Sequence, residues 1–197
     1  MTKPPKRKLP VTPEEQSASG LAFTNRVRDE TDRGKIIVAA AFLDEQLELA
    51  IRTYMRELPK DLESELFKGY GPLASFSGKI KLAFALKIID EAIYKDLLVI
   101  KALRNHFAHA YSDDSAYDDW IQKSAVSLAF GSTEDKNLKD FCFGLAVREE
   151  RQPNDEEWMV SPISISTTLV ATFQIAQKLS RIRHRRKRTV DETVVNP

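Results

Sequence analysis

Residues 71–111 read GPLASFSGKIKLAFALKIIDEAIYKDLLVIKALRNHFAHAY, and no other stretch of the chain constrains the architecture as strongly. It opens with a glycine–proline breaker, and its serines can cap a helix that starts near Lys79. Asp90 can cap the next helix. After each cap, apolar residues recur at intervals of three and four, the period of one helical face. The stretch therefore predicts an antiparallel helical hairpin with a tight connection.

The second of these helices ends in RNHFAH, residues 104–109. Arg104 lies four residues after Ile100, in the middle of the apolar stripe, where an unpaired charge is costly to bury. Asn105 and His109 are four residues apart and share a neighbouring face. Arg104 is therefore either a structural residue in an ion pair or, with Asn105 and His109, part of an anion-binding face.

Carboxylates that could pair with Arg104 occur in the preceding helix, which we expect from about residue 21 to 58 with a break at Gly34. Asp44 and Glu48 lie at its centre, four residues apart, and are the candidate partners. Two such carboxylates can also begin a metal site in a helical bundle. That site needs Glu-x-x-His ligands, which the chain lacks, so we expect no metal and no cofactor.

Composition bounds the class of protein. Of the 197 residues, 42% are hydrophobic and 30% are charged, which is ordinary for a globular protein. No apolar run approaches the roughly 20 residues that span a bilayer, so we expect no membrane association. The single cysteine, Cys142, excludes an internal disulfide and fits a reducing cytoplasm. Because it lies in an apolar run, we expect a buried, unreactive thiol.

Two ends of the chain have the composition of tails. Prolines, polar residues and cations dominate residues 1–20, and such a segment cannot form a core. The apolar stripe of the last helix ends at Ile182, and basic and polar residues follow it. We therefore predict one helical domain, residues 21–183, between two basic, disordered tails, residues 1–20 and 184–197.

The expected fold class is mainly all-α, with one exception near residues 140–165. FCFGLAV, residues 141–147, fits either a strand or a buried helical turn. WMVSPISI, residues 158–165, can pair with it as a second strand. We therefore expect a small β-hairpin in this region.

Charge is strongly uneven along the chain. Residues 1–10 carry four cations and residues 178–188 carry seven, so a total of +1 leaves −10 for the remainder. A reader of duplex DNA normally carries its basic patch on the folded domain, and this body is acidic. The basic end is a candidate surface for a nucleic acid or an acidic protein partner, through Arg181, Arg183, Arg185, Arg186, Lys187 and Arg188.

Residues 30–115 resemble the bacterial mannitol-operon repressor (MltR) family. The resemblance is carried by RGKIIVAAAFLDEQLELAI, residues 33–51, by GPLASFSGKI, residues 71–80, by Ile-Ile-Asp at 88–90 and by Arg-Asn-His-Phe-Ala-His at 104–109. It implies a homodimeric transcriptional regulator of a sugar operon that acts as a helical interaction module. In such a regulator, Arg104 pairs with Asp44 or Glu48 as a structural residue.

The spacing of Arg104 and His109 also resembles the HEPN superfamily of antiparallel helical bundles. Some of its members dimerise about this helix and cleave RNA without a metal. The resemblance implies that Arg104 holds the scissile phosphate, that Asn105 orients it and that His109 acts as general acid or base. These chemistries suit the side chains, because guanidinium matches phosphate and imidazole titrates near neutral pH.

Two functions therefore remain, and we favour the regulator over the ribonuclease. The regulator is not an enzyme. Two features favour it: Arg104 lies in the apolar stripe, and the chain between its two basic ends is acidic. Geometry separates the two functions. A ribonuclease needs Arg104 and His109 accessible to solvent, whereas the regulator needs Arg104 buried against a carboxylate.

Overall fold

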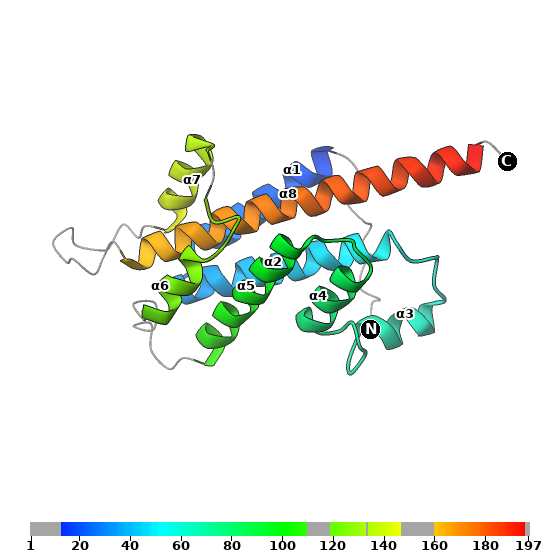
Figure 1. The fold of residues 1–197 in the computed structure, drawn as a ribbon, viewed down its shortest axis with the longest axis horizontal. Coiled ribbons are helices and arrows are strands. Elements are labelled where there is room, and N and C mark those ends of the chain that lie inside the picture. The colour runs from blue at the N-terminus through cyan, green and yellow to red at the C-terminus, as the bar shows by residue number, and fades with distance from the viewer. Residues whose placement is uncertain (1–12, 110–118, 133, 147–159, 196–197) are drawn as a thin grey trace.

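The computed structural model describes residues 13–109, 119–132, 134–146 and 160–195 (Figure 1). All regular structure in these residues is helical, which confirms the mainly all-α class. The helices are α1 (Pro13–Arg28), α2 (Asp32–Arg52), α3 (Lys60–Phe67), α4 (Phe76–Ala85), α5 (Glu91–His109), α6 (Asp119–Val126), α7 (Lys136–Ala146) and α8 (Val160–Val195).

The β-hairpin expected near residues 140–165 is wrong in the part that the structure describes. Most of FCFGLAV lies in α7, where Cys142, Leu145 and Ala146 face the core. From residue 160 the chain is already in α8. The apolar residues of α7 recur at steps of three and four, so one helical face buries them without a partner strand.

Helix boundaries differ from the expected ones at several points. The long first helix is two helices, because the chain breaks at residues 29–31 and Thr31 caps α2 by accepting a hydrogen bond from the Gly34 amide at 3.0 Å. Helix α1 begins at Pro13 and α8 continues to Val195, so helices extend into both segments expected to be tails. The division into one domain and two tails stays a prediction.

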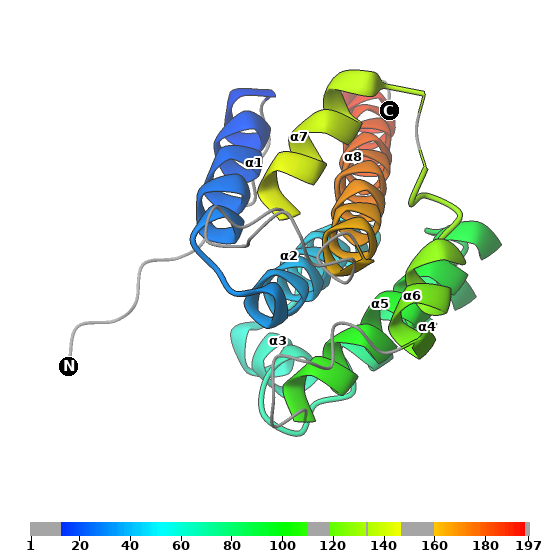
Figure 2. The ribbon, with the colours of Figure 1, turned by 90° about the vertical axis from the view of Figure 1, so that its left-hand side faces the viewer.

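Helices α2 and α8 pack against each other along the middle of the molecule. Figure 2 shows α1 and α7 on one side of this pair and α4, α5 and α6 on the other. The core has two clusters along the pair. One joins the second half of α2 to α4, the start of α5 and the middle of α8. The other joins α1, α7 and the end of α5 to the first halves of α2 and α8.

The hairpin of α4 and α5 forms as the sequence predicts. The Ser75 hydroxyl accepts from the Gly78 amide at 3.0 Å and caps α4. The Asp90 carboxylate accepts from the Ile93 amide at 2.8 Å at the start of α5. Both helices bury their apolar stripes against α2. This packing fixes where the RNHFAH sequence at the end of α5 lies.

Candidate functional site

The end of α5 presents Arg104, Asn105 and His109 to solvent. The neighbouring residues Leu103 and Phe107 are buried instead, and they anchor this turn of the helix in the core. One Nη of Arg104 donates a hydrogen bond to Oδ1 of Asn105 at 3.1 Å. All three polar side chains are thus exposed at the same end of α5, and a hydrogen bond joins two of them, Arg104 and Asn105.

Exposure of Arg104 corrects the expectation that its guanidinium is buried in the apolar stripe. Among the described residues, the expected partners Asp44 and Glu48 bind Lys79 of α4. Its Nζ lies 2.9 Å from Oδ1 of Asp44 and 2.9 Å from Oε2 of Glu48. Lys79 is 4% exposed, so it is the cation that the two carboxylates hold inside the bundle. The sequence pattern predicts Lys79 only as the start of a helix, so its role as the partner of the two carboxylates was not predicted.

Lys79, Asp44 and Glu48 form a group of charged residues, here called the Lys79 cluster, which Arg52 of α2 extends. Arg52 donates to Glu48 at 2.9 and 3.0 Å and to Glu63 at 2.7 Å, and its guanidinium lies 3.9 Å from the centre of the Phe67 ring. Burial raises the pKa of Glu48, but hydrogen bonds from Lys79 and Arg52 outweigh it, and the pKa lies below its ordinary value. The cluster therefore joins α2, α3 and α4.

Asp44 is the member of this cluster whose pKa is affected by the charge of Arg104. Burial raises its pKa above the ordinary value, and the contact with Lys79 only partly opposes this effect. The positive charge of Arg104 also lowers the pKa of Asp44. The exposed end of α5 and the Lys79 cluster are therefore electrostatic neighbours.

The basic end of α8 divides into exposed and buried cations. Arg181, Arg185 and Arg186 are exposed. Arg183 is only 6% exposed, and its Nη2 donates to the Gln46 side-chain oxygen at 2.9 Å. Burial lowers the pKa of its guanidinium, and Glu45 opposes this shift. Arg183 is thus a packing residue between α2 and α8 and leaves the predicted binding set. The side chains of Lys187 and Arg188 lie outside the described residues.

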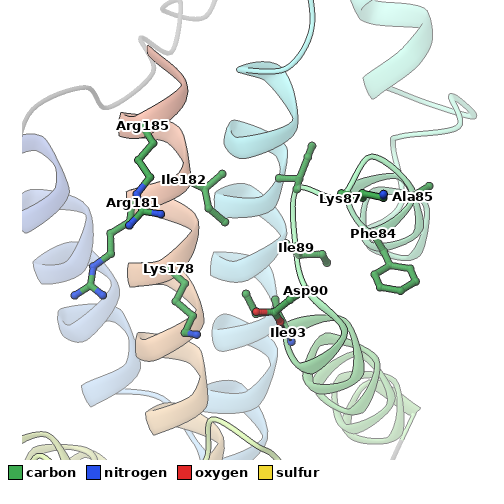
Figure 3. A pocket seen from close by; sticks show the side chains of 11 residues that line it. Phe84, Ala85, Lys87, Ile89, Asp90, Ile93, Lys178, Arg181, Ile182 and Arg185 are labelled. Carbon is green, nitrogen blue, oxygen red and sulfur yellow. Dashed lines mark hydrogen bonds between the residues drawn. The ribbon is translucent and has the colours of Figure 1, made fainter. Parts of the chain in front are cut away.

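A groove of about 860 Å³ lies beside the exposed cations of α8 (Figure 3). Its walls are the turn between α4 and α5 and the second half of α8. Lys178, Arg181 and Arg185 line the α8 side, and Lys87 lines the turn. The groove was not predicted from the sequence. The spacing of Lys178, Arg181 and Arg185, at steps of three and four, was the available signal.

Other chemistry has little support in the described residues. Cys142 is buried, as predicted, and burial raises the pKa of its thiol to about 12, so the thiol is not a nucleophile near neutral pH. Nowhere in the described ranges do three His, Cys, Asp or Glu side chains gather to hold a metal ion. None of the described helices has the length and apolar character needed to cross a membrane.

Comparison with known proteins finds two curated relatives. The mannitol operon repressor of Escherichia coli strain K12 is 31% identical over 108 residues, which are 51% of this chain and 55% of that protein. The mannitol operon repressor of Escherichia coli O6:H1 strain CFT073 gives the same values. The chain therefore spans about half the length of the curated relatives it matches. No family model matches the chain. No solved structure matches it either.

Proposed function

We propose that the protein is a cytoplasmic transcriptional regulator of a mannitol-type sugar operon. The single observation that carries this proposal is the 31% identity to two mannitol operon repressors. The matched segment is about half of each chain, which is the size of a domain. The regulator acts as a homodimeric helical module that binds other proteins.

Charge and fold support a module that contacts proteins rather than one that reads duplex DNA. Outside its two basic ends the chain carries −10, a charge that repels a phosphate backbone. Two large apolar side chains are exposed near the turn between α4 and α5, Phe84 at 40% and Leu86 at 48%. Exposed apolar groups of this kind are typical of protein contact surfaces.

The test is deletion of the gene in its own host, followed by transcript sequencing during growth with and without mannitol. We expect transcripts of a sugar-transport operon to rise in the deletion strain and to fall again with a plasmid copy of the gene. A plasmid copy carrying Leu43→Asp is the control, because Leu43 is fully buried and the charged variant cannot fold. Unchanged sugar-operon transcripts would refute the regulator.

A second candidate function is a metal-independent ribonuclease of the HEPN type. The observation that favours it is the exposure of Arg104, Asn105 and His109 on one helix end. In this function Arg104 binds the phosphate, Asn105 orients it and His109 moves the proton. The opposing observation is the acidic body, because its charge lowers the local concentration of RNA.

The two functions are separated by incubating the purified chain with mixed RNA in the presence of a metal chelator. The regulator predicts no cleavage above a buffer control. The ribonuclease predicts cleavage that His109→Ala abolishes and that His184→Ala retains, since His184 lies on α8, away from the end of α5. Cleavage with this pattern would replace the regulator as the main function.

A further inference from the structure

The groove beside α8 has an apolar floor. Ile88, Ile89 and Ile93 line it, and all three belong to the core cluster that joins α4, α5 and α8. Phe84 lines the outer part and is 40% exposed, with its ring stacked on Tyr94 at 4.3 Å between centroids. The floor is thus continuous with the core, and its outer edge presents an aromatic ring that is held in place.

Cations line both sides of this floor. Lys178, Arg181 and Arg185 lie at successive turns along α8 (Figure 3), and Lys178 is held by the Phe130 ring at 4.3 Å. On the other side Lys87 lines the groove from the turn. Asp90 is the acid among the lining residues, and one of its oxygens already caps α5. The groove therefore carries a net positive charge, whereas the chain outside residues 1–10 and 178–188 carries −10.

The size and chemistry of the groove fit one class of ligand. From Lys178 to Arg185 α8 advances by about 10 Å, at ~1.5 Å per residue, which is two helical turns. A bound helix of two to three turns places apolar residues at i, i+3, i+4 and i+7 against such a floor. Acidic residues on its flanks then meet the cations on both sides.

We propose that this groove, lined by Lys87, Lys178, Arg181 and Arg185 over the three isoleucines, is a docking site for an acidic amphipathic helix of a partner protein. The apolar floor distinguishes this ligand from a nucleic acid, whose phosphates gain nothing from isoleucine contacts. The inference names the partner class for the proposed regulator and rests on that function for its biological meaning.

The experiment measures fluorescence anisotropy of labelled 18-residue peptides titrated with the full chain. The main probe is a designed helix with leucine at i, i+3, i+4 and i+7 and glutamate on both flanks. A second peptide has lysine in place of each glutamate, and a third has the glutamates and leucines in scrambled order. We expect saturable binding of the first peptide and at least tenfold weaker binding of the other two.

Variants of the chain locate the binding site. Arg181→Glu combined with Lys87→Glu reverses one cation on each side, and we expect at least a tenfold loss of affinity for the acidic peptide. Lys81→Glu combined with Lys101→Glu makes the same change of charge outside the groove, and we expect less than a twofold loss. Far-ultraviolet circular dichroism of both double variants checks that the helices persist.

Three outcomes would overturn the proposal. The acidic peptide does not bind the folded chain, or it binds both double variants equally. In the third outcome, a single-stranded RNA of 18 nucleotides displaces the peptide and binds more tightly than it does. This result would assign the groove to nucleic acid.

Failure of this proposal is distinguishable from failure of the regulator, because the transcript measurement is independent. Sugar-operon repression without peptide binding would reject the groove and keep the regulator. Peptide binding without any effect of gene deletion would keep the groove and reject the regulator.

Discussion

Helices α5 and α8 each carry an arginine beside an apolar stripe, and the two arginines differ in burial: Arg104 is exposed and Arg183 is buried. Arg104 was expected to be buried and ion-paired, yet it is exposed at the end of α5. Arg183 was expected to be exposed and to bind ligands, yet it is 6% exposed and bonded to Gln46 of α2. The same kind of residue at the same kind of position therefore has two different roles.

The phase of each stripe explains the difference. A helical face continues after each turn by a step of either three or four residues, since 3.6 is not a whole number. From Ile100 the buried face of α5 takes the step of three to Leu103, which leaves Arg104 outside. From Leu179 the buried face of α8 takes the step of four, to Arg183. Only the placement of the neighbouring helices decides which step is taken.

Charge reversal at the two arginines gives the largest expected contrast. Arg183→Glu places a carboxylate at a buried position near Glu45, which already interacts with Arg183 through charge. An uncompensated buried charge of this kind costs about 3 to 5 kcal/mol, and we expect the free energy of unfolding in urea to fall by that amount.

Arg104→Glu is the matched control for Arg183→Glu. Because Arg104 is exposed, we expect its reversal to change the free energy of unfolding by less than about 0.5 kcal/mol. Equal losses in the two variants would show that α5 and α8 do not differ in the way described. A larger loss in Arg104→Glu would reverse the comparison and restore the expected ion pair of Arg104.

Local signals in the sequence were sufficient for the elements that a single residue fixes. Ser75 and Asp90 cap their helices as expected, because a cap depends on only three or four neighbouring residues. Contacts between side chains on different helices could not be predicted from such local signals. Nothing local relates Lys79 to two carboxylates of α2 or Arg183 to Gln46, which are 137 residues apart in the sequence.

The candidate site shows the same division. The identity of the three polar residues at the end of α5 followed from their spacing, and their exposure depended on the phase of the stripe. The groove was missed because its two walls come from residues 84–93 and 178–185, which are far apart in the sequence. A signal restricted to one helix, such as the cations of α8, cannot reveal the opposite wall.

The next test removes Lys79, the cation that pairs with Asp44 and Glu48 where Arg104 was expected. Lys79→Met leaves Asp44 and Glu48 facing each other without their shared cation. Breaking a buried ion pair costs about 3 to 5 kcal/mol, and we expect about 2 to 4 here because the two carboxylates are 30% and 27% exposed. The measurement is urea denaturation at neutral pH.

Lys81→Met on the same helix is the matched control, since Lys81 is exposed. We expect its free energy of unfolding to stay within about 0.5 kcal/mol of the unchanged chain. If Lys79→Met were equally harmless, Arg104 or another cation would have to replace Lys79. If Arg104 takes the place of Lys79, the double variant Lys79→Met and Arg104→Met should lose more free energy of unfolding than the two single variants together.

The smallest expected effect concerns a third cation, Lys87. Its distinguishing feature is its backbone conformation and not its place in an apolar stripe. Lys87 has φ of 54° just after α4, and the Ile88 amide donates to the Ala83 carbonyl at 2.9 Å across it. This is the left-handed position that closes a helix and that normally holds glycine. Lys87→Gly should therefore raise the free energy of unfolding by about 0.5 to 1 kcal/mol.

Lys87→Gly also removes one of the groove's cations, so stability and binding should move in opposite directions. A lysine kept where glycine is the better structural choice is expected if the ammonium group contacts a ligand, because strained positions are typical of functional sites. We expect the variant to be more stable and to bind the acidic peptide at least threefold more weakly. Lys87→Asn tolerates the same backbone and lacks the charge, so it should lose binding without the full gain in stability. Unchanged binding in both variants would leave Lys87 as a backbone feature alone and confine the basic side of the groove to α8.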